Sequence, residues 1–140
     1  MPTIQVVENL LMGNDCAVFW ATGQGKSLCY QLPSMFTNRP SVIVSPLISL
    51  MEDQCAKLNS TVLAANGPIA TFLGSGQRDP TEEGAALNGE RLFIYVTPER
   101  MCRSDFLESL ARLHSRKPLA LIAIDEAHCV SSWGHDFRNY

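Results

Sequence analysis

The sequence predicts an α/β fold in which a parallel sheet is covered by helices on both faces. Apolar β-branched runs alternate along the chain with segments of helical periodicity, and these runs are apolar at successive positions, as expected for strands buried on both faces. With 140 residues, 46% of them hydrophobic and 18% charged, the chain has the size and composition of a single folded domain.

The expected elements follow one another in regular alternation. A helix with apolar residues at helical spacing opens the chain and ends at the turn residues 13–15. Turn signals surround a short strand in the region 59–80. The further elements are, in order, a strand at 16–20, a helix from about Lys26 interrupted at Pro33, a strand at 41–45, a helix at 47–58, the short strand at 69–73, a strand at 91–96, a helix at 104–115 with Ser104 as N-cap, and a strand at 119–124.

Composition excludes several classes of protein. A formal net charge of -3 gives no overall basic field, so any contact with nucleic acid must be local. No apolar run approaches the roughly 18 to 20 residues of a membrane span, and the first residues lack the basic start of a secretory signal, so we expect no membrane and no export. The five cysteines are widely spaced without a C-x-x-C pair, which predicts reduced thiols.

The stretch "ATGQGKS", residues 21–27, predicts a phosphate-binding loop, or P-loop. A glycine turn between a strand and a helix directs backbone N–H groups and the positive end of the helix dipole at one point. Lys26 would add a charge for the outer phosphates, and Ser27 a hydroxyl able to hold Mg²⁺. The strict pattern G-x-x-x-x-G-K-[ST] is incomplete, because Trp20 replaces its first glycine.

A second motif, "DEAHC", directly follows the strand expected at 119–124. The carboxyl ends of strands are where ligands bind in open α/β sheets, so Asp125 is predicted to orient a Mg²⁺ shared with the P-loop. Glu126 would polarise the water that attacks the terminal phosphate. An acidic pair at the start of a surface loop is the alternative for this motif alone.

Together these motifs resemble superfamily-2 helicases, and "DEAHCVSSWGHDFRNY" resembles the RecQ family of DNA helicases. "SLCYQLP", "VIVSPLISLMEDQ", "FLGSGQ" and "FIYVTPER" follow the same family in order over nearly the whole chain, with "ATGQGKS", "LMEDQ" and "FLGSGQ" most similar to its Werner-type branch. The resemblance implies a RecA-like P-loop NTPase domain that uses ATP and Mg²⁺. The implied nucleotide contacts are Thr22, Gly23, Gln24, Gly25, Lys26 and Ser27, and the implied catalytic set is Lys26, Asp125, Glu126 and His128.

The resemblance also implies contacts with single-stranded DNA. "SPLISL" and "TPER" look like segments that touch the DNA backbone, and "CVSSWGHDFR" looks like the aromatic-rich loop that couples DNA binding to hydrolysis. Helix capping is an alternative role for the first two segments, and core packing for the aromatic residues. The residues concerned are Ser45, Pro46, Thr97, Arg100, Trp133, Phe137 and Arg138.

Gln5 occupies the place of the glutamine that reads adenine in this family. The aromatic residue and the arginine that precede it there are replaced by Met1 and Pro2, so Gln5 could equally be a plain helix-surface residue. A zinc site at 128–135 and a hydrolase triad at 132–136 are rejected, because neither the ligand spacing nor a nucleophile elbow fits.

The expected protein is a 3′ to 5′ DNA helicase of repair, recombination and replication that acts on single-stranded and branched DNA, nuclear in a eukaryote. Residues 1–140 would be the N-terminal part of its first RecA-like domain, without the second RecA-like, zinc-binding and winged-helix regions. The second domain supplies an arginine finger, worth about 10³ to 10⁵ in rate at related sites, so this chain should hydrolyse ATP poorly and not unwind alone. An RNA-directed ATPase and a non-catalytic truncated product are the alternatives.

Overall fold

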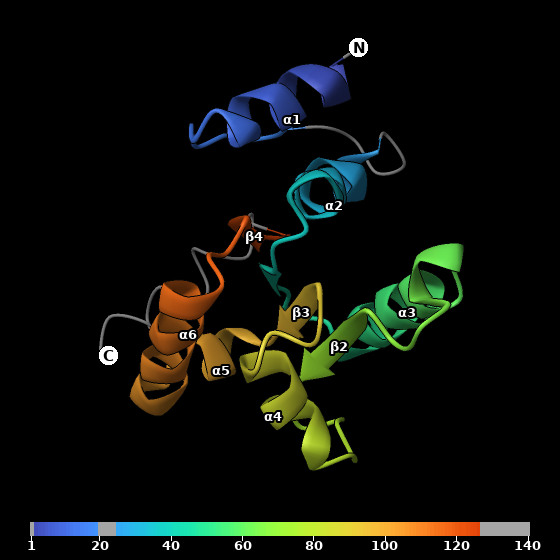
Figure 1. Cartoon of the computed structure of the whole chain (residues 1–140), viewed down its shortest axis with the longest axis vertical. Coiled ribbons are helices and arrows are strands. Elements are labelled where there is room, and N and C mark those ends of the chain that lie inside the picture. The colour runs from blue at the N-terminus through green and yellow to red at the C-terminus, as the bar shows by residue number, and fades with distance from the viewer. Residues whose placement is uncertain (1, 20–24, 127–140) are drawn as a thin grey trace.

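The computed structural model describes residues 2–19 and 25–126 of the chain. No helix among these residues is long and apolar enough to cross a membrane. The elements, shown in Figure 1, are α1 (Pro2–Leu11), α2 (Lys26–Thr37), β1 (Ser41–Val44), α3 (Ile48–Asn59), the 3-10 helix η1 (Val62–Ala64), β2 (Ala70–Leu73), α4 (Thr81–Leu87), β3 (Phe93–Val96), α5 (Pro98–Met101), α6 (Ser104–Arg116) and β4 (Leu121–Ile124).

The four strands form one parallel sheet in the order β2-β3-β1-β4. Val44 pairs with both Val96 of β3 and Ile124 of β4, so three strands end at the same level. Helices α2 and α3 lie on one side of this sheet, and α4 and α6 lie on the other (Figure 1). The predicted α/β fold with a parallel sheet and helices on both faces is therefore confirmed.

Two hydrophobic cores fix the helices to the sheet. The first packs α2 and α3 against one face, and the second packs α4 and α6 against the other, because successive strand residues point to opposite faces. The buried residues of the first core are Tyr30, Ile43, Met51, Cys55, Leu58, Ala70, Phe93 and Tyr95. Those of the second are Val42, Val44, Leu73, Ala86, Ile94, Val96, Phe106, Leu110 and Leu113.

Strand β4 corrects the expectation that every strand is buried on both faces. It forms an edge of the sheet, and its residues alternate between half-buried and exposed. Ile122 and Ile124 are 51% and 53% exposed, and Ile122 lines an open apolar groove with Leu107 and Leu110 of α6. The continuous apolar run predicted the strand correctly but not its exposure, since exposure depends on which neighbours the strand acquires.

Residues 16–19 do not form the strand expected at 16–20, and Phe19 is 93% exposed. A short apolar run becomes a strand only when a neighbouring strand pairs with it, and the described residues supply none for this segment. The apolar character of the segment was therefore an insufficient signal.

Helix α2 runs through Pro33 to Thr37 instead of stopping at the proline. Proline removes one backbone donor, but α2 also buries Tyr30, Gln31 and Ser34, and this packing outweighs the local cost. The predicted N-cap of α6 is also displaced by one residue.

Arg103 occupies the N-cap position of α6, and Ser104 begins the helix. This shift is within the usual uncertainty of a helix boundary.

Candidate functional site

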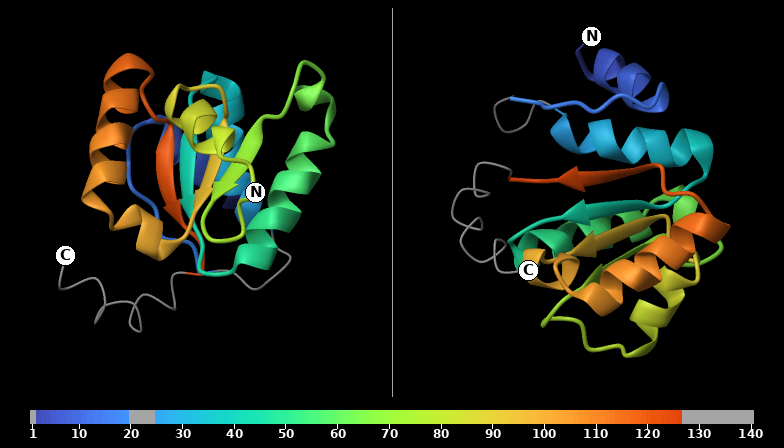
Figure 2. Two further views of the ribbon diagram at one scale, coloured as in Figure 1. Left: turned by 90° about the horizontal axis from the view of Figure 1, so that it is seen from below. Right: turned by 90° about the vertical axis from the view of Figure 1, so that its left-hand side faces the viewer.

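Polar residues follow three neighbouring strands at the point where each ends. Thr97 follows β3, Ser45 follows β1 and Asp125 follows β4. The hydrogen bonds between neighbouring strands continue to these polar residues. The Ser45 N–H donates to the Val96 carbonyl at 3.0 Å, and the Asp125 N–H donates to the Val44 carbonyl at 2.9 Å. Figure 2 shows that the arrowheads of these strands point to one edge of the sheet.

Helix α2 begins at this same edge, as Figure 2 shows. Gly25 stands at its N-cap position with φ of 81°, a left-handed conformation that glycine adopts without the strain of a Cβ atom. Lys26 and Ser27 form the first turn and are half-buried. The positive end of α2 and the charge of Lys26 therefore face the same region, which suits an anion.

Electrostatics link the start of α2 to the end of β4. Burial raises the pKa of Asp125, and the charge of Glu126 acts in the same direction, whereas the Glu126 N–H and the charge of Lys26 lower this pKa. The Glu126 N–H donates to Asp125 Oδ1 at 3.0 Å, and Glu126 has φ of 57°, an unusual conformation for a residue with a side chain. Lys26 and Asp125, which are 99 positions apart in sequence, thus belong to one site.

The donor set of this site fits a magnesium nucleotide. Mg²⁺ takes oxygen ligands from carboxylates, hydroxyls, water and phosphates, and it is seldom enclosed by protein alone. Asp125 and Ser27 offer one carboxylate and one hydroxyl, while Lys26 and the helix N-terminus suit the phosphates. No group of three or more His, Cys, Asp or Glu side chains that could hold a metal ion occurs among residues 2–19 and 25–126.

A buried layer under this edge escaped the sequence analysis. Tyr95 of β3 and Tyr30 of α2 pack edge to face, with ring centroids 6.4 Å apart and an interplanar angle of 78°. Burial raises the pKa of both tyrosines, and the charge of Asp125 adds to the shift in each. A tyrosine in the otherwise apolar run "FIYV", two residues before Thr97, was the only signal for this layer in the sequence.

Four of the residues predicted to contact DNA follow β1 and β3 but differ in accessibility, and they are Ser45, Pro46, Thr97 and Arg100. Ser45 is 1% exposed, whereas Pro46 is half-buried. Thr97 Oγ1 accepts from the Arg100 N–H at 3.3 Å and so caps α5. The Arg100 guanidinium lies 3.2 Å from the Glu83 carboxylate.

Gln5 stands exposed on α1, a helix that packs on α2. The remaining predicted site residues lie outside the described part of the chain. They are Thr22, Gly23, Gln24, His128, Trp133, Phe137 and Arg138.

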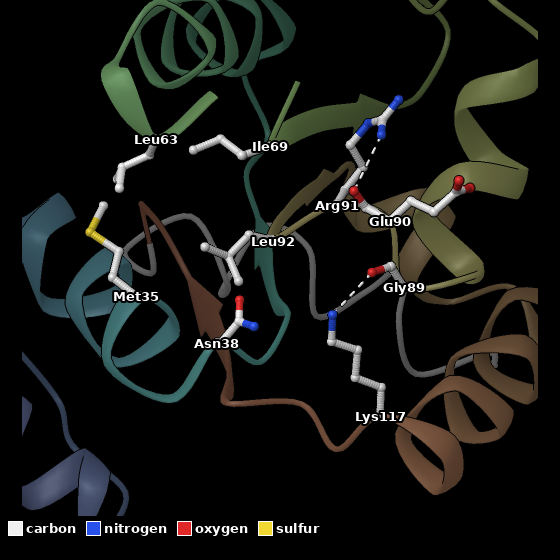
Figure 3. Close-up of a pocket in the computed structure, with 9 residues that line it drawn as sticks. All are labelled: Met35, Asn38, Leu63, Ile69, Gly89, Glu90, Arg91, Leu92 and Lys117. Carbon is white, nitrogen blue, oxygen red and sulfur yellow. Dashed lines mark hydrogen bonds between the residues drawn. The ribbon is translucent and has the colours of Figure 1, made fainter. Parts of the chain in front are cut away.

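A cavity of about 260 Å³ lies at the opposite edge of the sheet, near the amino ends of the strands (Figure 3). Its two basic side chains are engaged: Lys117 Nζ donates to the Gly89 carbonyl at 3.2 Å, and Arg91 lies 3.0 Å from Glu82. We place the functional site at the carboxyl edge instead, because the start of α2, which suits an anion, and the half-buried Asp125 carboxylate both lie there.

The parallel sheet, the glycine-started helix and the carboxylate after β4 define a nucleotide-binding α/β domain of the P-loop class. The profile of the DEAD/DEAH box helicase family matches residues 3–140, so the chain belongs to that family, whose domain is a RecA-like ATPase domain. The resemblance to RecQ helicases is confirmed by the curated relatives.

Three of these relatives illustrate the likeness. "ATP-dependent DNA helicase Q-like SIM" of Arabidopsis thaliana is 51% identical over 89% of this chain, and "ATP-dependent helicase wrn-1" of Caenorhabditis elegans is 48% identical over 96%. "ATP-dependent DNA helicase RecQ" of Haemophilus influenzae is 42% identical over 96%. The chain spans 14%, 12% and 21% of the lengths of these relatives, respectively.

Proposed function

We propose that this chain is the Mg-ATP-binding and single-stranded-DNA-binding part of a RecQ-type DNA helicase that moves 3′ to 5′ on single-stranded and branched DNA. The observation that carries the proposal is the meeting of Lys26 and Asp125 at the carboxyl edge of the sheet. Two of these relatives are named as ATP-dependent DNA helicases, which supports the choice of DNA as substrate.

Each residue has a distinct task in ATP hydrolysis. Lys26 and the N–H groups at the start of α2 hold the outer phosphates, and Ser27 and Asp125 hold Mg²⁺, which neutralises phosphate charge. Glu126 orients the attacking water and accepts its proton, for which a carboxylate must lie within hydrogen-bond reach. His128 belongs to the same motif and is assigned to the catalytic set by family resemblance.

DNA contact is assigned to the segments that follow β1 and β3. Ser45 begins one segment and Thr97 begins the other, so each segment starts one residue beyond the end of its strand, at the same edge as the nucleotide site. Trp133, Phe137 and Arg138 complete the proposed DNA surface with stacking faces and a charge.

We further propose that residues 1–140 are the N-terminal part of a first RecA-like domain and that efficient turnover requires a second RecA-like domain in cis. The cleft between two such domains brings an arginine to the phosphates. The catalytic set proposed for this chain contains no arginine. The Werner-type branch and, for a eukaryotic source, a nuclear location remain predictions, and imaging of the tagged protein would test the latter.

Nucleotide binding tests the first part of the proposal. Lys26→Ala should weaken Mg-ATP binding by about 10-fold or more, because one charge-assisted contact to phosphate contributes about 1.5–3 kcal/mol. Lys117→Ala is the matched control, since Lys117 lies at the opposite edge and its ammonium group bonds to a backbone carbonyl. Equal affinity of the two variants would refute the nucleotide site and favour a non-catalytic role.

ATP turnover with and without single-stranded DNA tests the second part. We expect slow turnover that Glu126→Gln abolishes while Mg-ATP binding persists. Stimulation by RNA equal to that by DNA would favour the RNA-directed ATPase. Fast DNA-stimulated turnover by this chain alone would refute the requirement for a second domain.

A further inference from the structure

Ser45 Oγ and Tyr95 Oη are buried at the carboxyl edge of the sheet and make no hydrogen bond of good geometry within the described ranges, although Tyr30 and Gln31 lie close enough to Tyr95 Oη to lower its pKa. Ser45 and Tyr95 are both 1% exposed. A hydroxyl removed from water normally gains a protein partner, because an unpaired one forfeits the bonds that water would make. The two hydroxyls on neighbouring strands therefore indicate a polar group that engages them in another state of the site.

The register of the sheet places both hydroxyls on the face and at the end that Asp125 occupies. Tyr95 pairs with Ile43 of β1, and Ile43 pairs with Ala123 of β4. Side chains two positions further on return to the same face, so Ser45 and Asp125 stand side by side just beyond Ile43 and Ala123. Tyr95 lies on the same face, one strand away from Ser45 and level with Ile43.

Packing holds the Tyr95 ring in this position. The edge-to-face contact with Tyr30 fixes the ring against α2, the helix that starts with Lys26. Burial raises the pKa of Tyr95 to about 12, and the negative charge of Asp125 contributes to that shift. The hydroxyl therefore stays protonated at neutral pH and can donate a hydrogen bond.

Asp125 has acceptor capacity to spare for these donors. Its Oδ1 accepts from the Glu126 N–H at 3.0 Å, and a carboxylate offers about four acceptor positions in all. A carboxylate that binds metal is commonly held by hydrogen bonds from neighbouring groups, which fix its orientation.

We infer that Ser45 and Tyr95 are positioning residues whose buried hydroxyls hold the Asp125 carboxylate when it turns to bind the metal of the nucleotide. Neither hydroxyl bonds to Asp125 in the present structure, so these bonds form on binding. The inference rests on the proposed role of Asp125 as the Mg²⁺-orienting residue. It also gives Ser45 a task toward the nucleotide, in addition to its place at the start of a proposed DNA-contacting segment.

The test compares the affinity of the full 140-residue chain for a non-hydrolysable fluorescent ATP analogue in Mg²⁺ and in EDTA. The ratio of the two affinities measures what the metal adds, independently of turnover. Ser45→Ala and Tyr95→Phe should each reduce this ratio by about 10-fold, the lower end for groups that orient a metal ligand. Their melting temperatures should stay equal to that of the unmodified chain or rise, because each substitution removes an unpaired buried hydroxyl.

Ser41→Ala is the matched control. Ser41 lies at the other end of β1, and its buried hydroxyl bonds to that of Ser34. Its removal should lower the melting temperature, because the Ser34 hydroxyl loses its partner, and should leave the affinity ratio unchanged.

Asp125→Asn separates failure of this inference from failure of the proposed function. If the metal adds nothing to the unmodified chain, or if Asp125→Asn leaves the ratio intact, the proposed metal site is wrong, and the inference falls with it. If Asp125→Asn removes the metal effect while Ser45→Ala and Tyr95→Phe preserve it, the metal site stands and the inference is overturned.

Discussion

Gly74 and Thr97 provide a sharp test of packing between the segments that follow β2 and β3. Leu73 pairs with Val96, so Gly74 and Thr97 lie one step beyond the paired ends of β2 and β3. A Cβ atom added at Gly74 would lie 2.9 Å from Thr97 Cγ2, closer than real Cβ contacts allow. Thr97 is 9% exposed and caps α5, so it has little freedom to move away.

Gly74→Ala should therefore lower the free energy of unfolding by about 1–3 kcal/mol, the usual cost of adding a methyl group to a packed site. Gly84→Ala should do the opposite, because Gly84 lies inside α4 and nothing stands within 4 Å of its added Cβ. The gain there should be about 0.5–1 kcal/mol, from the lower backbone entropy of alanine in the unfolded chain. Urea denaturation of both variants measures the two effects with opposite signs.

The clash itself is verified by a double substitution. Thr97→Ser removes Cγ2 but keeps the hydroxyl that accepts from the Arg100 N–H, so it should rescue Gly74→Ala. We expect a coupling free energy of about 0.5–2 kcal/mol in the favourable direction. Additive effects of Gly74→Ala and Thr97→Ser would refute the contact, and equal stabilities of the two alanine variants would refute the assignment of open and crowded sites.

Two further changes test the fold in the same urea assay. Asn59→Ala should cost about 2–4 kcal/mol, because the Asn59 side chain accepts from two backbone N–H groups at 2.8 and 2.9 Å and donates to a carbonyl at 2.9 Å at the start of β2; Asn88→Ala is the control and should have a much smaller effect. The Arg91 guanidinium holds the pKa of Glu82 below its ordinary value of 4.5, so this pair stabilises the fold above that pH and loses its effect as the pH falls through the lowered pKa. Glu82→Gln should therefore be less stable than the unmodified chain near neutral pH, with the difference shrinking on acidification, and a difference that is independent of pH would contradict the ion pair.

The four strands of the sheet were predictable because their sequence signal is local and consistent, whereas the strand expected at 16–20 does not form at residues 16–19. The runs at 41–45, 69–73, 91–96 and 119–124 are apolar, β-branched and bounded by turn residues, and each contains a strand of the sheet. Strand order and edge position were not predictable, because they depend on which strands pair across long stretches of sequence. Phe19 and Ile122 show the result, since both are apolar yet largely exposed.

The two charged residues of the nucleotide site, Lys26 and Asp125, were predictable for a different reason. Lys26 and Asp125 each stand in a motif whose residue types and order are tied to phosphate and metal chemistry, so their meeting could be inferred before any contact was known. Tyr95 and the burial of Ser45 could not be inferred in this way. Their position on the same sheet face as Asp125 follows from the register of three strands, and no short motif records that register.

That register also has a mechanical consequence. Ser45 stands beside Asp125 and begins one proposed DNA segment, and Thr97 begins the other. Backbone hydrogen bonds of 2.9 and 3.0 Å join all three strand ends, so a displacement of β1 caused by DNA at Pro46 is transmitted to Asp125. If the Ser45 hydroxyl holds the carboxylate, DNA binding and metal binding share one structural element, and Ser45→Ala should weaken the effect of Mg²⁺ on DNA affinity as well as on nucleotide affinity. Fluorescence anisotropy of labelled single-stranded DNA, measured with the ATP analogue in Mg²⁺ and in EDTA, detects this coupling, and an undiminished Mg²⁺ effect in Ser45→Ala would show that the two sites do not communicate through β1.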